Sequence, residues 1–589
     1  MTDGSEKEER WGRVLIAGGI GWATNGKKER QANSSGSADL LEPHILRSIC
    51  NVKITKIFTG PAANYAIAID VHGAAHLFGK IPCPALAGTP TGIISEHTPL
   101  RVSPTSVGLP RGTKWVHAAA ARGHILLVDS LGGVWGCGNN VMGQLGLGVC
   151  PEVEKFTRVT GPWMREKDAS IVSVSAGHTF SLFLTNTGQV YAAGSSESGQ
   201  LGNGKTGKSN PADRVGERLL KAGKVSYDVE VPPRLVQGLG DRKITQIASG
   251  NQHSLAMDSE GYVYAWGFAG YSRLGLQDQK DRLVPTLVPS FAGKNELSRA
   301  QWIFCGPTNS VVVDRQGLYW MAGKWKLTGD GSIGQPYTSF KTIQDIMGCK
   351  VLAASSGGCT HFLTTPDAKG GIMTVGFGQG CLYGELGLGP DLGKSTTRPT
   401  QIMPLEGIDV IDVAAGAFFT LFLARPNGAL SDVPRHPVHI ASASLCLVCN
   451  THRNDDDLPL ECEKCDQPYH LDCLTPPLDE IPEGEWFCPV CEKEEEQAER
   501  AVEETSVEEK ELHADTDTGT GTGTGTGTPR AKSATRSVTP KTGARKGTTP
   551  RRSETPRRSE TPAGTAGTAG GIKRKAESKI GPGEYYDVQ

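Results

Sequence analysis

The sequence contains no uninterrupted apolar run of the ~18 residues that a membrane-spanning helix needs. Aromatic residues make up only 6% of the chain, and the 75 glycines do not recur at every third position, which excludes collagen. The first ten residues, MTDGSEKEER, lack the apolar core of a secretory signal. We therefore expect no membrane association, and we expect the 15 cysteines to be reduced and to serve in metal binding or packing.

The net charge of -2 hides a strong separation of charge along the chain. Residues 446–491 carry 11 acidic and 2 basic side chains, and residues 492–511 carry 10 and 3. By contrast, residues 512–589 carry 14 basic and 7 acidic side chains, and residues 1–445 carry 42 and 35. An acidic middle between basic ends suggests polycationic and polyanionic partners at different places.

Two short modules recur through the first 430 residues with a period of roughly 50 to 70 residues. The first is an apolar strand, a small-small-Gly turn and a second apolar strand; its seven copies start near Ile54, Lys114, Ile171, Ile244, Gln301, Val351 and Val410. The second is a strand that ends in Trp-Gly or small-Gly; its seven copies start at Val14, His76, Val134, Val190, Val263, Leu318 and Met373. Alternating apolar residues bounded by glycine predict short antiparallel strands.

The order of the modules predicts how the array closes. The chain opens with a second-type module at Val14 and ends with an unpaired first-type module at Val410. The two ends should therefore complete one blade together, which would remove the open edges of the array. The prediction is an all-β fold, a seven-bladed β-propeller whose N- and C-terminal strands share a blade.

The glycine turns GQLGLG from Gly143, GQLGNG from Gly199 and GELGLG from Gly384 resemble those of the regulator of chromosome condensation family of seven-bladed propellers. The segments that start at Trp11 and Ala265 are similar to the telophase-disc branch of that family. This resemblance implies a propeller over residues 11–430, chromatin association and, in some members, nucleotide exchange on a small GTPase. Many propellers of the family only scaffold.

One position of the first module holds His124, His253 and His361, and it holds Asn64, Phe180, Asn309 and Phe419 in the other copies. We interpret these histidines as structural. Long insertions lie at residues 80–113, 205–243 and 278–299. The second contains a candidate partner loop with Lys205, Lys208, Arg214, Arg218, Lys221 and Lys224, which could meet a GTPase or a phosphate backbone or could simply be a solvated basic loop.

A dense cysteine pattern follows the repeats. Its ligand-type residues are Cys446, Cys449, Cys462, Cys465, His470, Cys473, Cys488 and Cys491. Eight such residues in four pairs match two tetrahedral zinc ions. With the histidine fifth and Trp486 two residues before the seventh ligand, the pattern resembles a plant homeodomain (PHD) finger. That resemblance implies interleaved ligands, with Cys446, Cys449, His470 and Cys473 holding one zinc and Cys462, Cys465, Cys488 and Cys491 holding the other.

PHD fingers read histone tails, so we expect a histone partner. The place where a trimethyl-lysine reader carries a cage tryptophan is Pro468, and Tyr469 and Trp486 are interpreted as the finger's own core. The residues expected at the tail are Asp457, Leu458, Leu460, Glu461, Glu463, Asp466, Pro482 and Gly484. In similar fingers, residues at the places of Glu463 and Asp466 bind the tail's arginine. An unmodified tail is favoured; the alternative is a finger that folds but binds no histone.

The remaining residues are predicted to be a charged spacer at 494–516 and a disordered Gly/Thr and Thr-Pro-rich tail at 517–589. The basic tail can contact nucleic-acid phosphates. The phosphorylation candidates, each directly before a proline, are Thr528, Thr539, Thr549 and Thr555. Phosphate there would weaken contact with DNA.

The predicted domains are a disordered N terminus at 1–10, the propeller at 11–430, a linker at 431–443, the finger at 444–493, and the spacer and tail. We see no phosphate loop, nucleophile elbow or open metal site, so no catalytic residues are expected. The predicted function is a nuclear, chromatin-associated adaptor whose finger binds a histone tail and whose propeller binds proteins. The alternative is a small-GTPase exchange factor that the finger localises to chromatin.

Overall fold

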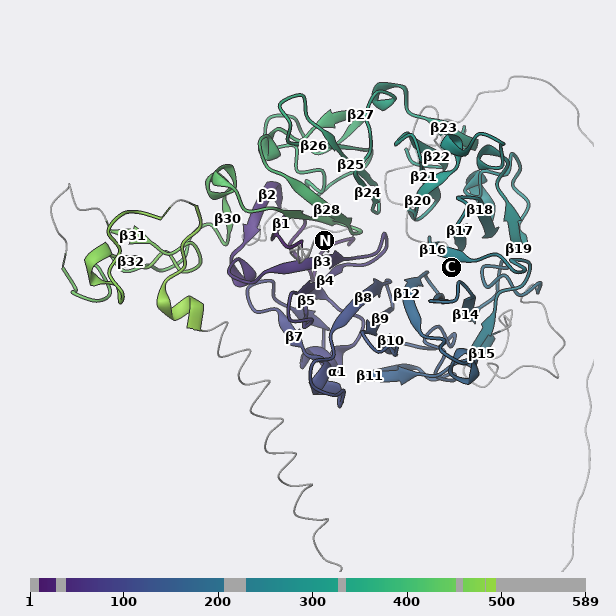
Figure 1. Ribbon diagram of the computed structural model, residues 1–589, viewed down its shortest axis with the longest axis horizontal. Coiled ribbons are helices and arrows are strands. Elements are labelled where there is room, and N and C mark those ends of the chain that lie inside the picture. The colour runs from purple at the N-terminus through teal and green to yellow at the C-terminus, as the bar shows by residue number, and fades with distance from the viewer. Residues whose placement is uncertain are drawn as a thin grey trace, which may run out of the picture. The chain divides into compact units, whose positions relative to one another are not determined.

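A computed structural model describes residues 10–27, 39–205, 229–326, 335–451, 459–482 and 484–493. In these residues the strands form seven sheets of four or more strands, arranged as blades around a centre, and one two-stranded sheet (Figure 1). These seven sheets confirm the predicted seven-bladed propeller. None of the helices in this part of the chain is long and apolar enough to cross a membrane.

Six blades are continuous in the sequence. The first two comprise β3 (Ile54–Phe58), β4 (Tyr65–Asp70), β5 (Ala75–Lys80), β6 (Ile93–Ile94) and β7 (Leu100–Val102), then β8 (Trp115–Ala120), β9 (His124–Asp129), β10 (Val134–Asn139) and β11 (Glu152–Val159). The next two comprise β12 (Ile171–Ala176), β13 (Phe180–Thr185), β14 (Val190–Ser195) and β15 (Val229–Leu235), then β16 (Ile244–Ser249), β17 (His253–Asp258), β18 (Val263–Gly267) and β19 (Arg282–Leu287). The last two comprise β20 (Ala300–Cys305), β21 (Asn309–Asp314), β22 (Tyr319–Gly323) and β23 (Tyr337–Thr342), then β24 (Ala353–Ser356), β25 (Thr360–Pro366), β26 (Ile372–Gly378) and β27 (Thr396–Gln401).

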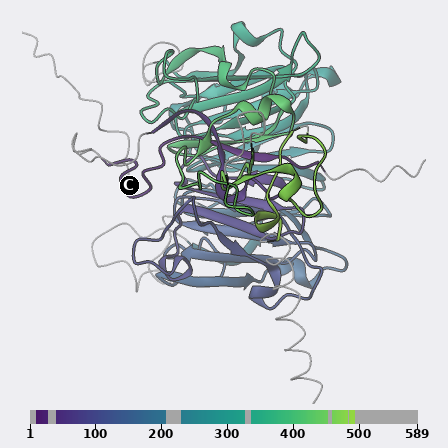
Figure 2. The same cartoon turned by 90° about the vertical axis from the view of Figure 1, so that its left-hand side faces the viewer.

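The seventh blade, which we call the closing blade, joins the two ends of the repeat array. It consists of β28 (Val410–Ala415), β29 (Phe419–Ala424), β1 (Arg13–Gly18) and β2 (Leu40–Leu46), in that order. β1 lies antiparallel to β29, with Leu15 opposite Phe422. Seen from the side, the purple strands of β1 and β2 lie beside green strands from the far end of the array (Figure 2). The predicted shared blade is confirmed, and β30 (Arg435–His436) extends it as a short parallel partner of β2.

Within the described residues, the connections of the propeller contain one short α-helix and several 3-10 turns. They are α1 (Pro84–Ala87), η1 (Arg47–Ile49), η2 (Pro104–Val107), η3 (Pro162–Arg165), η5 (Gly270–Ser272), η6 (Pro289–Phe291), η7 (Glu296–Ser298), η8 (Gln344–Ile346), η9 (Met403–Leu405) and η10 (Gly428–Asp432). The insertion at 80–113 therefore contains α1, β6, β7 and η2, and the insertion at 278–299 contains β19, η6 and η7.

The glycine that ends the third strand of a blade is required by crowding. Gly138 and Gly194 have φ of 107° and 115°, a region that residues with a side chain rarely adopt. A Cβ on Gly194 would lie 2.4 Å from the carbonyl oxygen of Thr179, the residue just before the preceding strand β13. The Trp-Gly and small-Gly strand ends that identified the repeat are thus set by backbone approach and need no ligand.

Strand register corrects the alignment of the first module. His124, Phe180, His253, Asn309 and Phe419 each lie opposite such a glycine, but Tyr65 and Thr360 hold that place in the other two blades. Asn64 and His361, which the sequence alignment places at this position, each lie one residue away from it in the strand. Because side chains alternate across a strand, a slip of one residue places a side chain on the opposite face.

The three histidines are nevertheless buried structural groups. Nε2 of His124 lies 2.8 Å from Oγ of Ser181, and Nε2 of His253 lies 3.1 Å from Oγ of Ser310, each in the next blade along the chain. Desolvation lowers the pKa of His124 to about 3, the pKa of His361 to about 3 and the pKa of His253 well below its usual value. They therefore remain neutral and link neighbouring blades.

Each glycine-rich turn is held locally by a buried side chain in its second position. The side-chain carbonyls of Gln144 and Gln200 accept hydrogen bonds from the backbone N–H groups of Met142 and Ser198, at 3.0 and 2.8 Å. Glu385 replaces glutamine in GELGLG, and its carboxyl oxygen accepts from the N–H of Tyr383 at 2.9 Å. Desolvation is the largest effect on this carboxyl and raises its pKa to about 7. The turn GELGLG therefore carries an ionisable side chain at the position where the other two turns carry a neutral glutamine.

We expect Glu385→Gln to stabilise the propeller above neutral pH. Because the folded-state pKa is above the unfolded value of 4.5, the stability of the wild type relative to the variant falls as the pH rises from about 4.5 to 7. The difference should reach at most about 3 kcal/mol, since one pKa unit corresponds to about 1.4 kcal/mol. Urea denaturation at pH 5 and pH 8 measures it, and identical unfolding free energies for the two proteins at pH 8 would contradict the argument.

After the closing blade the chain forms the small finger. Its described elements are β31 (Leu460–Glu461), β32 (Pro468–Tyr469) and η11 (Leu471–Cys473). β31 and β32 are antiparallel, with Leu460 opposite Tyr469. A compact cluster around Tyr469, Leu474 and Cys488 is the finger's core, and the Tyr469 and Trp486 rings pack edge to face at 5.7 Å. The expected core role of these two aromatic residues is confirmed.

Candidate zinc centres and tail-binding face

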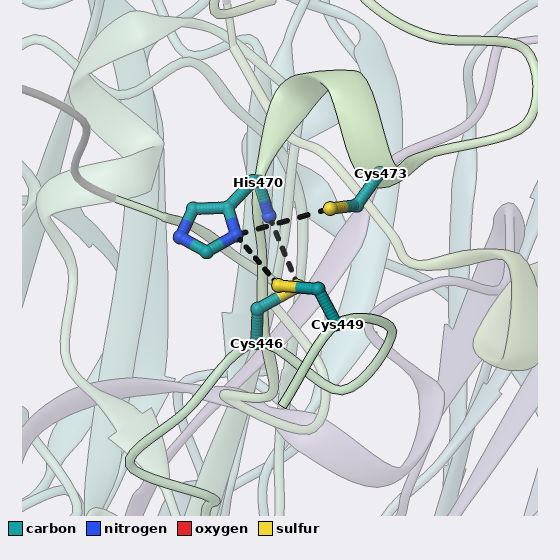
Figure 3. A group of neighbouring side chains, drawn as sticks. All are labelled: Cys446, Cys449, His470 and Cys473. Atoms are coloured by element: carbon teal, nitrogen blue, oxygen red, sulfur yellow. Dashed lines mark hydrogen bonds between the residues drawn. The ribbon is translucent and has the colours of Figure 1, made fainter. Parts of the chain in front are cut away.

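The first predicted ligand group is assembled in the structure. Cys446, Cys449, His470 and Cys473 present one ligand atom each, and these atoms all lie within 4.8 Å of one another (Figure 3). Nδ1 of the buried His470 ring lies 3.3 Å from Sγ of Cys449 and 3.9 Å from Sγ of Cys473. The imidazole therefore faces the thiols through Nδ1, the atom that would bind the metal.

The second group is assembled in the same way from Cys462, Cys465, Cys488 and Cys491. A hydrogen bond with the Cys491 thiol is the largest effect on Cys462 and lowers the pKa of this thiol. The shift favours the thiolate, the form that binds zinc. The backbone N–H of Cys488 donates to Sγ of Cys462 at 3.3 Å and orients it.

Three thiols with one imidazole, and four thiols, are the donor sets of structural zinc sites. Both groups fit such an ion, and each fills all four tetrahedral positions, which leaves no position for a reacting water. The two groups can hold two zinc ions, and zinc there would stabilise a finger whose own core is too small to fold without it.

The two turns Cys446–Cys449 and Cys462–Cys465, which we call the knuckles, are each followed by a residue with left-handed backbone. Asn450 follows Cys449 with φ of 53°, and Asp466 follows Cys465 with φ of 50°. Asparagine and aspartate tolerate this region better than other side-chain-bearing residues. The N–H groups of Asn450 and Asp466 donate to the carbonyls of Cys446 and Cys462, both at 2.8 Å. Asp466 therefore has a local conformational role, which an asparagine could also fill.

A third cluster of ligand-type side chains lies where β30 meets the propeller. Nε2 of His436 lies 3.0 Å from one oxygen of Glu96, and Nε1 of Trp22 donates to the other at 2.6 Å. His97, which is exposed, completes the group. Hydrogen bonds within the protein already satisfy the Glu96 carboxylate, so we interpret the cluster as a tie that holds the segment leading to the finger.

The most informative contacts of the finger are with the closing blade. Arg47, at the start of η1, donates from Nη1 and Nη2 to the two carboxylate oxygens of Asp466, at 2.7 and 2.8 Å. Nη1 of the same guanidinium also lies 3.4 Å from the carbonyl oxygens of Glu463 and Lys464. Such a two-pronged arginine–carboxylate pair is strong and geometrically specific.

Two further ion pairs join the same surfaces. Nε of Arg13 in β1 donates to Glu485 at 2.8 Å, and both side chains are at least nine-tenths buried. Arg435 in β30 pairs with Glu463. We call Arg13, Arg47 and Arg435 the docking arginines, and Asp466, Glu463 and Glu485 the docking acids.

Apolar and backbone contacts accompany the ion pairs. The Phe487 ring packs against the buried cluster of the closing blade that includes Leu430 and Val433. The Arg13 guanidinium lies 5.3 Å from the Phe487 ring centre. Nδ2 of Asn51 donates to the carbonyl of Cys491 at 3.0 Å. The finger therefore docks on the propeller through a mixed polar and apolar surface, and both belong to one compact unit.

The predicted tail-binding residues have different positions. Leu460 and Glu461 form β31, and Glu463 and Asp466 face the docking arginines. Pro482 and Gly484 lie in the predicted turn, where Gly484 has φ of 90°. Asp457 and Leu458 lie outside the described residues. The roles of all these residues in binding a tail remain predictions.

Much of the predicted partner and tail surface also lies outside the described residues. This holds for Lys208, Arg214, Arg218, Lys221 and Lys224, for the spacer and tail after residue 493, and for Thr528, Thr539, Thr549 and Thr555. Lys205 is described, and its ammonium pairs with Glu230 at 3.2 Å.

Comparison with known proteins identifies both domains. A family profile described as the RCC1-like domain matches residues 16–422, more than half of the chain. The chain belongs to the RCC1-like domain family. A second profile, for the PHD finger, matches residues 446–491, which hold all eight candidate ligands. An RCC1-like propeller joined to a PHD finger indicates a chromatin-related regulator.

Individual relatives match the propeller. The chain is 29% identical over 434 residues to the RCC2 homologue of Xenopus laevis, covering 70% of this chain and 78% of that protein. It is 28% identical to human RCC2, covering 70% and 76%. Among solved structures, Prp20p of Saccharomyces cerevisiae superposes with a TM-score of 0.54 at 19% identity, covering 71% of this chain and 92% of that one. Human WBSCR16 gives 0.54 at 21% identity, covering 71% and 99%. These two structures support the fold alone.

The docking arginines of this RCC1-like propeller were not found by sequence reasoning. Arg13, Arg47 and Arg435 are far apart in the chain, and no sequence pattern groups them. The only signal was the opposite charge of residues 1–445 and residues 446–491. We assigned that contrast to separate external partners, whereas part of it is satisfied inside the molecule.

We expect the full chain to bind two zinc ions and Cys462→Ser to bind fewer, because the variant removes a thiolate ligand from the second site. Native mass spectrometry of the intact protein measures the ratio. Cys150→Ser is the matched control, since Cys150 lies in the propeller outside both groups and should retain two ions. One or no zinc in the wild type would show that the pairing of ligands is wrong.

Proposed function

We propose that this protein is a nuclear chromatin adaptor whose PHD finger binds the unmodified, basic N-terminal tail of a histone. In this proposal the propeller offers binding surfaces to protein partners, and the basic C-terminal tail adds contacts to nucleic-acid phosphates. Three weak contacts on one chain strengthen one another through effective concentration.

The observation that carries the proposal is that the finger's acids already hold a guanidinium. Asp466 binds Arg47 with both oxygens, and Glu463 pairs with Arg435. In PHD fingers that resemble this one, residues at these two places bind the arginine of the tail. The acid pair therefore has the geometry for an arginine ligand, and the arginine of a histone tail has the same chemistry.

The sheet of the finger offers a place for the peptide backbone. Among the described residues, β31 pairs only with β32, so its other edge has no partner strand. An extended peptide can add to such an edge through main-chain hydrogen bonds. The exposed Glu461 on β31 adds a negative charge beside that edge, which favours a basic peptide.

The same face supports the preference for an unmodified tail. Tyr469 is buried and packs with Trp486 in the finger's core, and the buried Pro468 occupies the place of a cage tryptophan. A trimethylated lysine would lack both a cage and the N–H donors that acidic side chains require.

Nucleotide exchange on a small GTPase is the alternative function. The Prp20p structure is described together with binding properties to Gsp1p and histones, but at 19% identity that likeness concerns the fold. The basic loop proposed for a GTPase lies mostly outside the described residues. Exchange therefore stays a prediction, and release of labelled GDP from candidate GTPases by the full chain tests it.

We expect the full chain to bind an unmodified histone-tail peptide more tightly than its trimethylated form, measured by isothermal titration calorimetry. In a background in which Arg47 and Arg435 are changed to methionine, so that Asp466 has no arginine partner within the protein, Asp466→Asn should weaken binding of the unmodified peptide by about 10- to 100-fold, because a charge-assisted hydrogen bond contributes about 1.5–3 kcal/mol. Asparagine is chosen because Asn450 adopts the same backbone conformation in the sister knuckle.

Asp479→Asn is the matched control, since it removes the same charge from an exposed side chain of the finger. Tighter binding of the trimethylated peptide would contradict the proposed preference. Equal affinity with and without Asp466→Asn in the background that lacks Arg47 and Arg435 would show that the acid pair does not hold the tail.

A further inference from the structure

The acids that would bind the tail's arginine are occupied by arginines of the propeller. Both carboxylate oxygens of Asp466 accept hydrogen bonds from Arg47, whose side chain is 9% exposed. Glu463 is paired with Arg435. A second guanidinium cannot form the same two-pronged contact with Asp466 while Arg47 remains in place, because the same oxygens are used and the two cations repel each other.

Arg47 also contacts the backbone of the finger, in addition to the Asp466 carboxylate. Besides the carboxylate, its Nη1 reaches two backbone carbonyls of the knuckle, those of Glu463 and Lys464. The opposite end of the guanidinium is fixed by the propeller, because Nε donates to the carbonyl of Pro437 at 2.7 Å. The propeller thus presents a pre-positioned arginine to the finger's acid pair.

Occupation of the acids is connected to docking of the whole finger. Arg13 holds Glu485, Asn51 holds the Cys491 carbonyl, and Phe487 packs on the closing blade. On the finger, these contacts involve residues between 485 and 491, which are separate in sequence from β31. The Arg47–Asp466 pair is therefore one of several contacts that hold the finger on the closing blade.

We infer that the propeller competes with the histone tail for the finger's acids. Arg47 and Arg435 occupy the carboxylates that would otherwise bind the tail's arginine. The docked finger is closed to that arginine, and tail binding and docking exclude each other at Asp466 and Glu463. This inference rests on the proposed function and adds its regulation. The apparent association constant for the tail is the intrinsic association constant multiplied by the fraction of fingers that are undocked.

The test compares tail affinities of full-length proteins that differ only in the competitor. The double variant Arg47→Met with Arg435→Met keeps the aliphatic bulk of both side chains and removes both guanidinium groups. The matched control is Arg234→Ala with Arg282→Ala, two propeller arginines that pair with acids of their own neighbourhood, Glu230 and Asp278. The probe is an unmodified histone-tail peptide, titrated by calorimetry, with melting temperature and zinc content as checks of folding.

The double methionine variant should bind the peptide about tenfold or more tightly than the wild type, which corresponds to a wild-type finger that is at least about 90% docked. The control should bind like the wild type. Adding Asp466→Asn to the methionine variant should remove the gain, because the freed acid is what the tail then uses.

The outcomes separate the inference from the function on which it rests. Equal peptide affinity of the wild type and the methionine variant, with loss in Asp466→Asn, would overturn the competition and leave the histone reader intact. No binding by any of the four proteins would overturn the reader and the competition together. An equal gain in the control pair would attribute the effect to net charge and would also overturn the competition.

Discussion

The pairing of β1 with β29 is the constraint on which the rest of this structure depends. It closes the ring of blades with strands separated by about four hundred residues of chain, and it removes the free edges that an open array would present. Closure also assembles a surface that no continuous segment could form. Arg13 on β1, Arg47 after β2 and Arg435 on β30 meet on the closing blade only because the two ends of the array are joined there.

The finger takes its position from that surface. Its own core is one small cluster around Tyr469 and Cys488, so a finger of this size depends on further support, which the two candidate zinc groups and the surface against which it packs can supply. Buried ion pairs gain little over apolar contacts of the same shape, but removal of one partner leaves a costly unpaired charge. The three arginine–acid pairs therefore specify where the finger sits more than they add to stability. They also place its acid pair under the control of the propeller.

The parts of the fold that were predictable are those that repeat. Glycines at strand ends and turns mark every blade because a side chain there would collide with a neighbouring backbone, and the order of the modules fixed the shared blade. Zinc ligands were predictable because their residue types and spacing are specific to the chemistry. Register was harder: Tyr65 and Thr360 hold places assigned to Asn64 and His361, because burial on both faces leaves little alternation to read.

The docking face could not be derived from the sequence, because it depends on three-dimensional closure and on single arginines that no sequence pattern groups. Asp466 illustrates the difficulty, since one residue has a left-handed backbone after the second ligand pair, is proposed to bind the tail and binds Arg47. The proposed role in tail binding follows from the resemblance. The contact with Arg47 became visible only with the propeller in place.

Hydrogen exchange of the full-length protein, with and without an unmodified histone-tail peptide, tests the account most directly. The reporters are the amides of Ile45, Cys50 and Val52, which are bonded to Pro434, Arg47 and Ile49 beside the docking arginines. If tail binding and docking exclude each other, peptide should accelerate exchange at these amides while those of β17, in a distant blade, stay unchanged. Unchanged or slower exchange at Ile45, Cys50 and Val52 with the peptide bound would contradict the account.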